Sequence, residues 1–333
     1  METLIPLLVP MGIFDSIGGF FTTLMTPLHW AVSGLLVLFH WLYSPLLGTD
    51  SGATWVLAIV SLTIVVRACT IPLFVKQIQS SRNMQMIQPK VRELQKKYGH
   101  DRERLGQETM KLYREENANP MASCLPMLLM MPVFFALFQV LSGAARGQAH
   151  GAWLEDRPDL VESLRAATIF GARISDQLWP FSGINNVFIV TVVLILAMTG
   201  TMFYTQLQLM RKNMPPEALT GPMAQQQKMM LYIFPIIFAV GGVNFPVGVL
   251  IYWLTSNLWT AGQQYYIIKR NPAPGTEAYK EWEAKRKAKG LPVGGAPAVV
   301  AATDGDPGTG PTDVTKIQRQ QPRKQTRSQR NKK

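Results

Sequence analysis

The chain has 333 residues, a formal net charge of +12, and 47% hydrophobic residues. Its length would allow two soluble domains. However, apolar runs long enough to cross a bilayer alternate with basic segments, which is typical of a polytopic membrane protein. The two cysteines, Cys69 and Cys124, lie in or beside apolar runs, so the sequence predicts neither a disulfide framework nor a metal site.

The N-terminal region contains no Lys or Arg before Arg67. It therefore has neither the charged start of a secretory signal nor the Arg-rich composition of an organelle transit peptide. A bacterial inner (cell) membrane is the simplest location for such a chain.

Residues 1–52 are predicted to form an extracytoplasmic N-terminal region with one helix over 24–47. This segment is apolar enough to be a sixth span, and that alternative stays open. We favour an amphipathic helix lying in the outer interface, because interfacial helices combine a polar face with Trp residues. The polar residues near one face are His29, Ser33, His40 and Ser44, and the apolar residues off that face are Trp30, Val37, Leu38 and Trp41.

Five apolar segments between residues 53 and 270 are predicted to cross the membrane. The stretch 228–270 is too long for one span of about 20 residues. Gly241, Gly242 and Asn244 lie near its middle, where a tight turn would divide it into two spans. The predicted spans are 53–75, 120–141, 186–209, 228–243 and 246–268.

Lys and Arg are distributed unevenly between the segments that join these spans. Residues 76–119 carry ten, residues 210–228 carry three and residues 269–333 carry fifteen, whereas residues 142–185 carry four against five acidic residues. Since Lys and Arg collect in cytoplasmic loops, we expect an all-α integral membrane protein with its N-terminus outside and its C-terminus in the cytoplasm. Residues 142–185 then form a mixed polar loop on the outer side.

The segment 76–119 is predicted to be a cytoplasmic helical hairpin. Gly99 is predicted to end its first helix, and Asp101 is predicted to be the N-cap of the second. The segment 271–333 is predicted to be a basic cytoplasmic tail that is mostly disordered, with a short charged helix over 277–289.

Arg67 is the strongest candidate for a functional residue. A charged side chain within a span costs at least about 2.5–3.5 kcal/mol, so it usually faces a polar cavity or a partner. No acidic residue occurs in the five predicted spans, so a visiting molecule could supply the counter-ion. The alternative is that Arg67 snorkels toward the cytoplasmic interface near Lys76.

Polar residues recur at helical spacing along the spans and predict a hydrated groove around Arg67. Thr63 and Thr70 share its helical face, and Gln139 lies in the second span. Ordinary interhelical hydrogen bonding would explain each residue singly, but several polar stripes beside an unpaired Arg favour a groove. The other members are Thr201, Thr205 and Gln208 in the third span and Trp253, Asn257, Thr260 and Gln264 in the fifth.

Enzyme signatures are weak in this sequence. No phosphate-binding glycine loop is present, and no spacing suggests a metal site. The four His residues lie outside the five predicted spans, so an intramembrane serine site would lack its base. We therefore expect a non-enzymatic protein without cofactor or metal.

Four blocks of the sequence resemble the YidC/Oxa/Alb insertase family. They are IVVRACTIPL (64–73), QPKVRELQKKYG (88–99), NPMASCLPMLLMMPVFFALFQVL (119–141) and NFPVGVLIYWLTSNLWTAGQQYYI (244–267). Their order and spacing also agree, over about residues 53–270. The sequence departs from the family pattern at Ala122-Ser123, where Gly-Gly is frequent, and at Met130, where a Gln is common. The large outer domain of some members is absent.

The resemblance implies a five-helix insertase core around a hydrophilic groove that opens to the cytoplasm and to lipid and is closed on the outer side. It implies that Arg67 attracts acidic residues of a substrate, and that Thr63 and Trp253 line the path along which the substrate's helix enters lipid. The implied partners are nascent membrane proteins, the lipid bilayer, the Sec translocon and, through the basic tail, the ribosome. A basic tail equally suits a purely topological role.

A small polytopic transporter or channel is the alternative function. It would need a polar path that reaches both faces of the membrane, and usually two repeated halves. The sequence contains no evident internal repeat.

Overall fold

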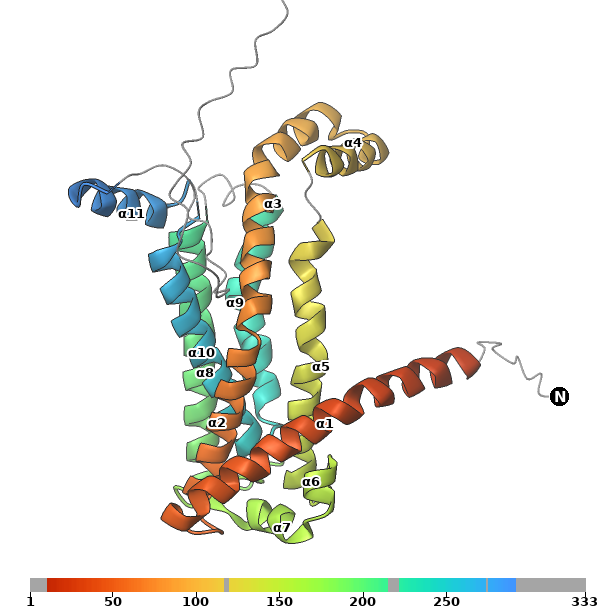
Figure 1. Ribbon diagram of the computed structural model, residues 1–333, viewed down its shortest axis with the longest axis vertical. Coiled ribbons are helices and arrows are strands. Elements are labelled where there is room, and N and C mark those ends of the chain that lie inside the picture. Colours follow the sequence, from red (N-terminus) through yellow and green to blue (C-terminus); the bar gives the residue numbers. More distant parts are fainter. Residues whose placement is uncertain (1–10, 117–119, 215–221, 274, 292–333) are drawn as a thin grey trace, which may run out of the picture. The chain divides into compact units, whose positions relative to one another are not determined.

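A computed structural model describes residues 11–116, 120–214, 222–273 and 275–291, which all lie in one compact unit, Met1–Val299 (Figure 1). The elements are α1 (Met11–Leu47), α2 (Gly52–Cys69), α3 (Ile71–Tyr98), α4 (Arg102–Glu115), α5 (Pro120–Ala145), α6 (Ala152–Glu155), α7 (Pro158–Ala166), β1 (Thr168–Ile169), β2 (Ala172–Arg173), α8 (Asn186–Asn213), α9 (Pro222–Gly242), α10 (Val247–Arg270) and α11 (Glu277–Ala288). The mainly helical fold that the sequence predicts is confirmed.

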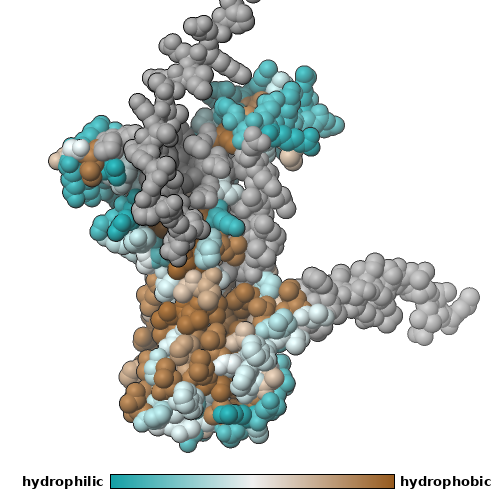
Figure 2. Space-filling model, viewed as in Figure 1, coloured by the Kyte–Doolittle hydropathy of each residue, from teal (hydrophilic) through white to brown (hydrophobic). Residues whose placement is uncertain are grey.

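The long helices α2, α5, α8, α9 and α10 lie side by side as a bundle (Figure 1). Helix α10 packs against α2, α5 and α8, and α9 packs against α8. Trp55, Ile59, Leu137 and Val247 are fully or almost fully buried where these helices meet. On the face drawn in Figure 2, apolar residues cover the middle of the bundle, and hydrophilic residues gather over α4 and α11. This distribution matches a bundle whose middle contacts lipid.

Three helices in the described part of the chain are long and apolar enough to cross a membrane, namely Thr23–Leu47, Gly52–Cys69 and Asn186–Lys212. The second and third fall on predicted spans, and the first is the segment predicted to lie in the interface. Shorter apolar helices, Met131–Ala145 and Lys228–Gly242, fall on two further predicted spans. The number of spans stays a prediction.

The first predicted span, 53–75, is divided between two helices. Helix α2 ends at Cys69, Thr70 lies at the junction, and Pro72 stands in the first turn of α3. Proline lacks a backbone N–H and restricts the residue before it, which explains why the helix is interrupted here. Arg67 therefore lies in the last turn of α2 and not in the middle of a continuous helix.

The predicted turn within the segment 76–119 is confirmed. Helix α3 ends at Tyr98 with Gly99 as its C-cap. The carboxylate of Asp101 accepts a hydrogen bond from the backbone N–H of Arg104 at 3.0 Å and so caps α4.

The segment 142–185, predicted as a mixed polar loop, is largely folded. We call residues 152–176 the outer cap, because they belong to the loop that is predicted to lie on the outer side; it comprises α6, α7 and the antiparallel pair β1–β2. Leu154 and Leu164 are buried in the main hydrophobic core. Backbone N–H groups at the start of α10 donate to the cap at 2.9 Å, from Val247 to Asp176 O and from Gly248 to Ile174 O. The cap therefore closes one end of the bundle.

Helix α1 runs obliquely across the bundle beside the outer cap (Figure 1) and packs against α2, α5 and α6. Its polar face is turned toward the protein. His40 is buried, its Nε2 lies 2.8 Å from Thr49 O, and its ring centroid lies 4.1 Å from that of Trp55. Trp30 and Trp41 point outward and are 56% and 68% exposed. Trp30, Leu38 and Trp41 are thus available to lipid, whereas the prediction for Val37 is wrong, because Val37 is buried in the hydrophobic core.

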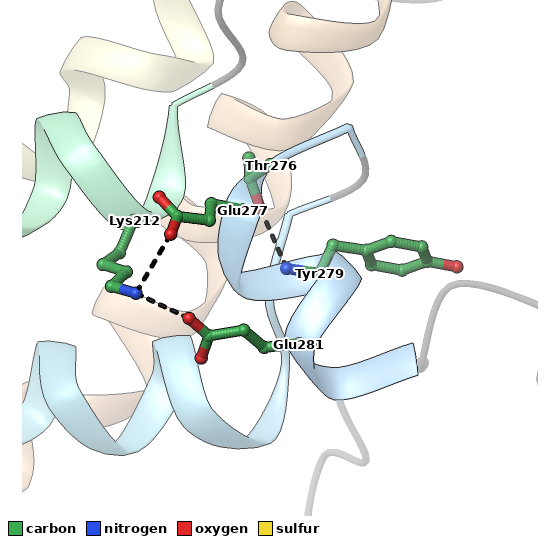
Figure 3. A network of polar contacts seen from close by, with 5 residues as sticks. All are labelled: Lys212, Thr276, Glu277, Tyr279 and Glu281. Carbon is green, nitrogen blue, oxygen red and sulfur yellow. Dashed lines mark hydrogen bonds and ion pairs between the residues drawn. The ribbon is translucent and has the colours of Figure 1, made fainter. Parts of the chain in front are cut away.

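Helix α11 confirms the predicted short charged helix. Its N-cap is Thr276, whose hydroxyl accepts from Tyr279 N at 3.3 Å. Lys212 at the end of α8 reaches Glu281 at 2.6 Å and Glu277 at 3.4 Å (Figure 3). These ion pairs are exposed, so salt screens them and they contribute little to stability. The predicted disordered tail beyond α11 lies outside the described residues.

Candidate functional site

The guanidinium of Arg67 is held by a neutral hydroxyl. Its Nε donates to Ser256 Oγ on α10 at 2.8 Å, and Nη2 donates to the same oxygen. Ser256 is almost fully buried, and Tyr252 lies one turn before it on α10. Among the residues that the structure describes, no carboxylate forms an ion pair with Arg67. Within this part of the chain, the Arg67 guanidinium therefore has a neutral hydrogen-bond partner and no counter-ion.

A cavity of about 270 Å³ lies beside Arg67, with walls from α2, α3, α5 and α10. This volume has room for several water molecules. Polar groups from each of three helices face it, and none of the described residues that line it is acidic. The lining residues are Thr63, Val66, Arg67, Thr70, Leu73, Phe74, Gln77, Val133, Phe134, Leu137, Tyr252 and Gln263.

Thr63 and Thr70 lie in the wall of this cavity, where the sequence predicts them. Their hydroxyls donate to their own helix, Thr63 to Ile59 O at 2.6 Å and Thr70 to Arg67 O at 2.9 Å. A hydroxyl that donates still has lone pairs free to accept. Both residues can therefore offer acceptors to water or to a polar ligand in the cavity.

Trp253 does not line the Arg67 cavity. Its ring belongs to an aromatic cluster, with centroids 5.6 Å from Phe134, 4.9 Å from Phe238 and 5.3 Å from Phe245. Phe134 does line the cavity. Trp253 thus packs against Phe134 in the cavity wall and links it to Phe238 on α9.

Four other predicted groove residues, Thr205, Asn257, Thr260 and Gln264, line a separate cavity of about 160 Å³ between α8, α9 and α10. Among the described residues, no partner reaches the buried Nδ2 of Asn257 or the buried Oε1 of Gln264. Gln208 is not among the residues that line either cavity, and its buried Oε1 likewise has no partner among the described residues. An unsatisfied buried polar group costs about 1–3 kcal/mol, so water or a ligand is expected in this second cavity. The single predicted groove is divided into two cavities.

Gln139 lies away from both cavities. Its Oε1 is 2.7 Å from His29 Nε2 on α1. The His29 ring centroid lies 5.8 Å from that of His150, which precedes the outer cap. Burial lowers the pKa of His150, the neighbouring His29 lowers it further, and Glu155 raises it. Gln139 therefore joins α5 to α1 and does not face Arg67.

Sequence reasoning missed the partner of Arg67. The predicted stripe on α10 began at Trp253, whereas Tyr252, Ser256 and Gln263 form the neighbouring stripe, at i, i+4 and i+11. This spacing was visible in the sequence. The rotation of α10 that turns this stripe toward α2 depends on packing and could not be read from it.

The sequence matches the family described as "60Kd inner membrane protein" over residues 46–274. A Streptomyces avermitilis protein described as "Membrane protein insertase YidC" is 45% identical over 272 residues, which cover 79% of this chain and 62% of that protein. A Tropheryma whipplei (strain Twist) protein with the same description is 37% identical over 293 residues, which cover 84% of this chain and 93% of that protein.

A solved structure titled "Active YidC insertase crystal structure with the first transmembrane domain resolved" is 27% identical, with a TM-score of 0.42, and the match covers 71% of this chain and 45% of that one. The chain therefore spans less than two thirds of the Streptomyces relative and nearly all of the Tropheryma relative. The family match and the identities to the Streptomyces and Tropheryma relatives show that the chain is a membrane protein that belongs to the YidC/Oxa/Alb family.

Proposed function

We propose that this protein is a membrane protein insertase. It receives hydrophobic segments of nascent proteins from the cytoplasm in a hydrophilic groove containing Arg67 and releases them laterally into the bilayer, and it also assists their folding. The descriptions of the two relatives support this reaction. The observation that carries it is the Arg67 guanidinium, which among the described residues is held by a neutral hydroxyl, beside a cavity with mixed polar and apolar walls.

The Arg67 cavity lowers the cost of moving a polar segment. Such a segment resists leaving water because its polar groups lose hydration. A carboxylate placed about 4 Å from the guanidinium gains roughly 4 kcal/mol at an effective dielectric constant of 20. The hydroxyl of Ser256 is neutral, so a passing carboxylate can replace it without separating an ion pair. Arg67 thus acts as a transient counter-ion.

The substrate's own hydrophobic helix supplies the net free energy. Burying apolar surface in lipid is favourable by about 25 cal/mol per Å², so no nucleotide is required. Phe134, Val133 and Leu137 give the cavity an apolar wall on α5, along which such a helix can slide. Trp253 stiffens this wall through its contact with Phe134.

The second cavity, lined by Thr205, Asn257, Thr260 and Gln264 with Gln208 nearby, extends the hydrophilic path toward α8 and α9. Its unpaired amide groups favour water there. We assign Gln139 to the junction with α1 instead of the groove.

The proposed orientation places the outer cap and α1 outside and the hairpin α3–α4 in the cytoplasm. The oblique course of α1 and its outward Trp residues support an interfacial helix, with the five bundle helices as spans (Figure 1). The packed outer cap supports a groove that is closed on the outer side. Cooperation with the Sec translocon, and ribosome docking by the basic tail, complete the proposal.

Disulfide crosslinking tests the proposed path. Cys69 and Cys124 are first replaced by Ala, and Thr63→Cys is then paired with a stalled nascent chain that carries one cysteine in its hydrophobic segment. We expect a crosslink, because Thr63 lines the Arg67 cavity. Leu57→Cys on the same helix is the control, since Leu57 is 40% exposed and does not line this cavity. Equal crosslinking at both positions would contradict the proposed path. The absence of crosslinks combined with solute flux through liposomes would favour a transporter.

A further inference from the structure

A second concave surface, which we call the tryptophan groove, lies between α1 and α6. Its volume is about 580 Å³, and its lining includes Trp30, Leu38 and Trp41 from α1 together with Trp153 and Arg157. The three tryptophans are 43% to 68% exposed. The groove is separate from the Arg67 cavity and shares none of its lining residues.

Close packing between α1 and α6 fixes the groove. A side chain at Gly34 would place its Cβ 3.0 Å from Trp153 Nε1, so the absence of a side chain lets the indole approach α1. Gly151 adopts a φ of 96°, and a Cβ there would lie 2.5 Å from both His29 O and Ser33 Oγ. Glycine is the residue that fits this conformation and this distance. The two glycines therefore allow the segment around α6 to lie close against α1 at the groove.

Arg157 supplies the charge of the groove. It is the N-cap of α7, and its side chain makes no capping hydrogen bond. In the described part of the chain, no carboxylate forms an ion pair with its guanidinium, and no acidic residue lines the groove. The nearby carboxylate of Glu155 accepts from Gly151 N at 3.0 Å instead. Arg157 is thus an exposed cation beside an apolar trough.

This combination matches the chemistry of a phospholipid. Tryptophan is enriched where hydrocarbon meets headgroups, and the planar guanidinium of Arg pairs with phosphate in a bidentate way. A membrane protein offers its exposed apolar surface to lipid, and here that surface is concave and bordered by the guanidinium of Arg157. We propose that the tryptophan groove binds one phospholipid, with an acyl chain against Trp30, Trp41 and Trp153 and the phosphate on Arg157. The binding does not depend on the insertase activity.

Fluorescence quenching tests this site in the full-length protein in detergent. Phosphatidylglycerol with brominated acyl chains is titrated while tryptophan emission is recorded, since three of the eight tryptophans line the groove. We expect one saturable quenching phase. Arg157→Gln should weaken the apparent affinity roughly tenfold, because it removes a charge-assisted hydrogen bond. Arg165→Gln is the matched control, since Arg165 is exposed in the neighbouring helix α7 and pairs with Glu162 at 3.6 Å; it should match the unmodified protein.

Two further arms separate the headgroup from the acyl chain. Brominated diacylglycerol, which lacks phosphate, should bind more weakly and should not respond to Arg157→Gln. Ala31→Phe, which projects a ring into the groove from an exposed position on α1, should abolish the saturable phase for both lipids. Quenching that rises without saturation, or that is identical in the Arg157→Gln and Arg165→Gln variants, would overturn the proposal. So would a photo-crosslinker at Leu38 that captures a protein helix while no lipid saturates.

Discussion

The Arg67 cavity and the outer cap differ in how their polar side chains are paired. In and around the outer cap, polar side chains pair with each other inside the protein: Trp55 Nε1 donates to Ser163 Oγ at 3.1 Å, and His29 Nε2 lies 2.7 Å from Gln139 Oε1. At the other site, the positive charge of Arg67 meets the neutral hydroxyl of Ser256 and, among the described residues, no carboxylate, beside a cavity. Paired polar groups stabilise the fold, whereas a charge without a counter-ion can pair with a bound ligand.

The largest stability effect is expected from Trp55→Ala in the bundle beneath the cap. Trp55 is fully buried, its ring lies in tilted contact with that of His40, and its Nε1 donates a hydrogen bond to Ser163 Oγ. Truncating such a side chain costs about 3–5 kcal/mol, so the apparent unfolding midpoint in detergent should fall steeply. Trp41→Ala, at a 68% exposed position, is the control and should change the midpoint little. Similar losses in both variants would mean that the cap is not packed as described.

A pair of serines gives the next largest effect and compares the two regions directly. Ser163→Ala leaves the buried Trp55 N–H unpaired, which costs about 1–3 kcal/mol. Ser256→Ala should cost less than about 1 kcal/mol, because water in the cavity can solvate the Arg67 guanidinium. Thermal unfolding of both variants in the same detergent measures the difference. A larger loss for Ser256→Ala would show that the Arg67 site is dry.

A smaller effect is expected from pH at the edge of the cap. Burial lowers the pKa of His150, so the folded protein favours the neutral ring. The unfolded chain therefore binds more protons once the pH falls below the ordinary histidine pKa of about 6.5. The stability contributed by neutral His150 is complete above that pH and is lost as the pH falls through the lowered pKa.

His150→Gln should flatten this part of the pH profile of the unfolding midpoint. His100→Gln is the control, because His100 is exposed in the turn between α3 and α4. If the unfolding midpoint of His150→Gln depends on pH as steeply as that of the unmodified protein, His150 is not the cause of the pH dependence.

The smallest effect is expected from Glu281→Gln on α11. It removes the ion pair with Lys212 (Figure 3), which is exposed and screened by salt. The same pair lowers the pKa of Glu281, so its contribution is present at neutral pH and is lost in acid. The global unfolding midpoint should not change, whereas limited trypsin cleavage within α11 should become faster at low salt. Glu283→Gln, at a position that pairs within α11 with Lys287, is the control. Faster cleavage in both variants would point to weaker helix formation and not to docking.

Local signals in the sequence predicted local features. Gly99 and Asp101 marked the turn of the hairpin, and the Gly and Asn residues near position 243 marked the break between α9 and α10, because capping and turn formation depend on neighbouring residues. Arg67 stood out because a lone charge in an apolar run is costly in any fold.

Features that depend on distant contacts were not predictable in the same way. The outer cap looked like a polar loop because its order comes from partners such as Trp55, which lies 108 residues before Ser163. Ser256 lies 189 residues after Arg67, and the division of the groove into two cavities depends on how α10 is rotated against its neighbours. Helical periodicity gives the faces of a helix but not which neighbour each face meets.

The most direct test of the account compares two substrates that differ only in the charge of the translocated tail. Arg67→Ala should reduce insertion of the acidic-tail substrate about tenfold or more, since it removes a charge-assisted interaction of about 1.5–3 kcal/mol, and Arg67→Lys should restore part of it. Insertion of the neutral-tail substrate should change by less than about twofold. If Arg67→Ala inserts both substrates equally well, or loses both equally while remaining folded, the guanidinium does not serve as a transient counter-ion.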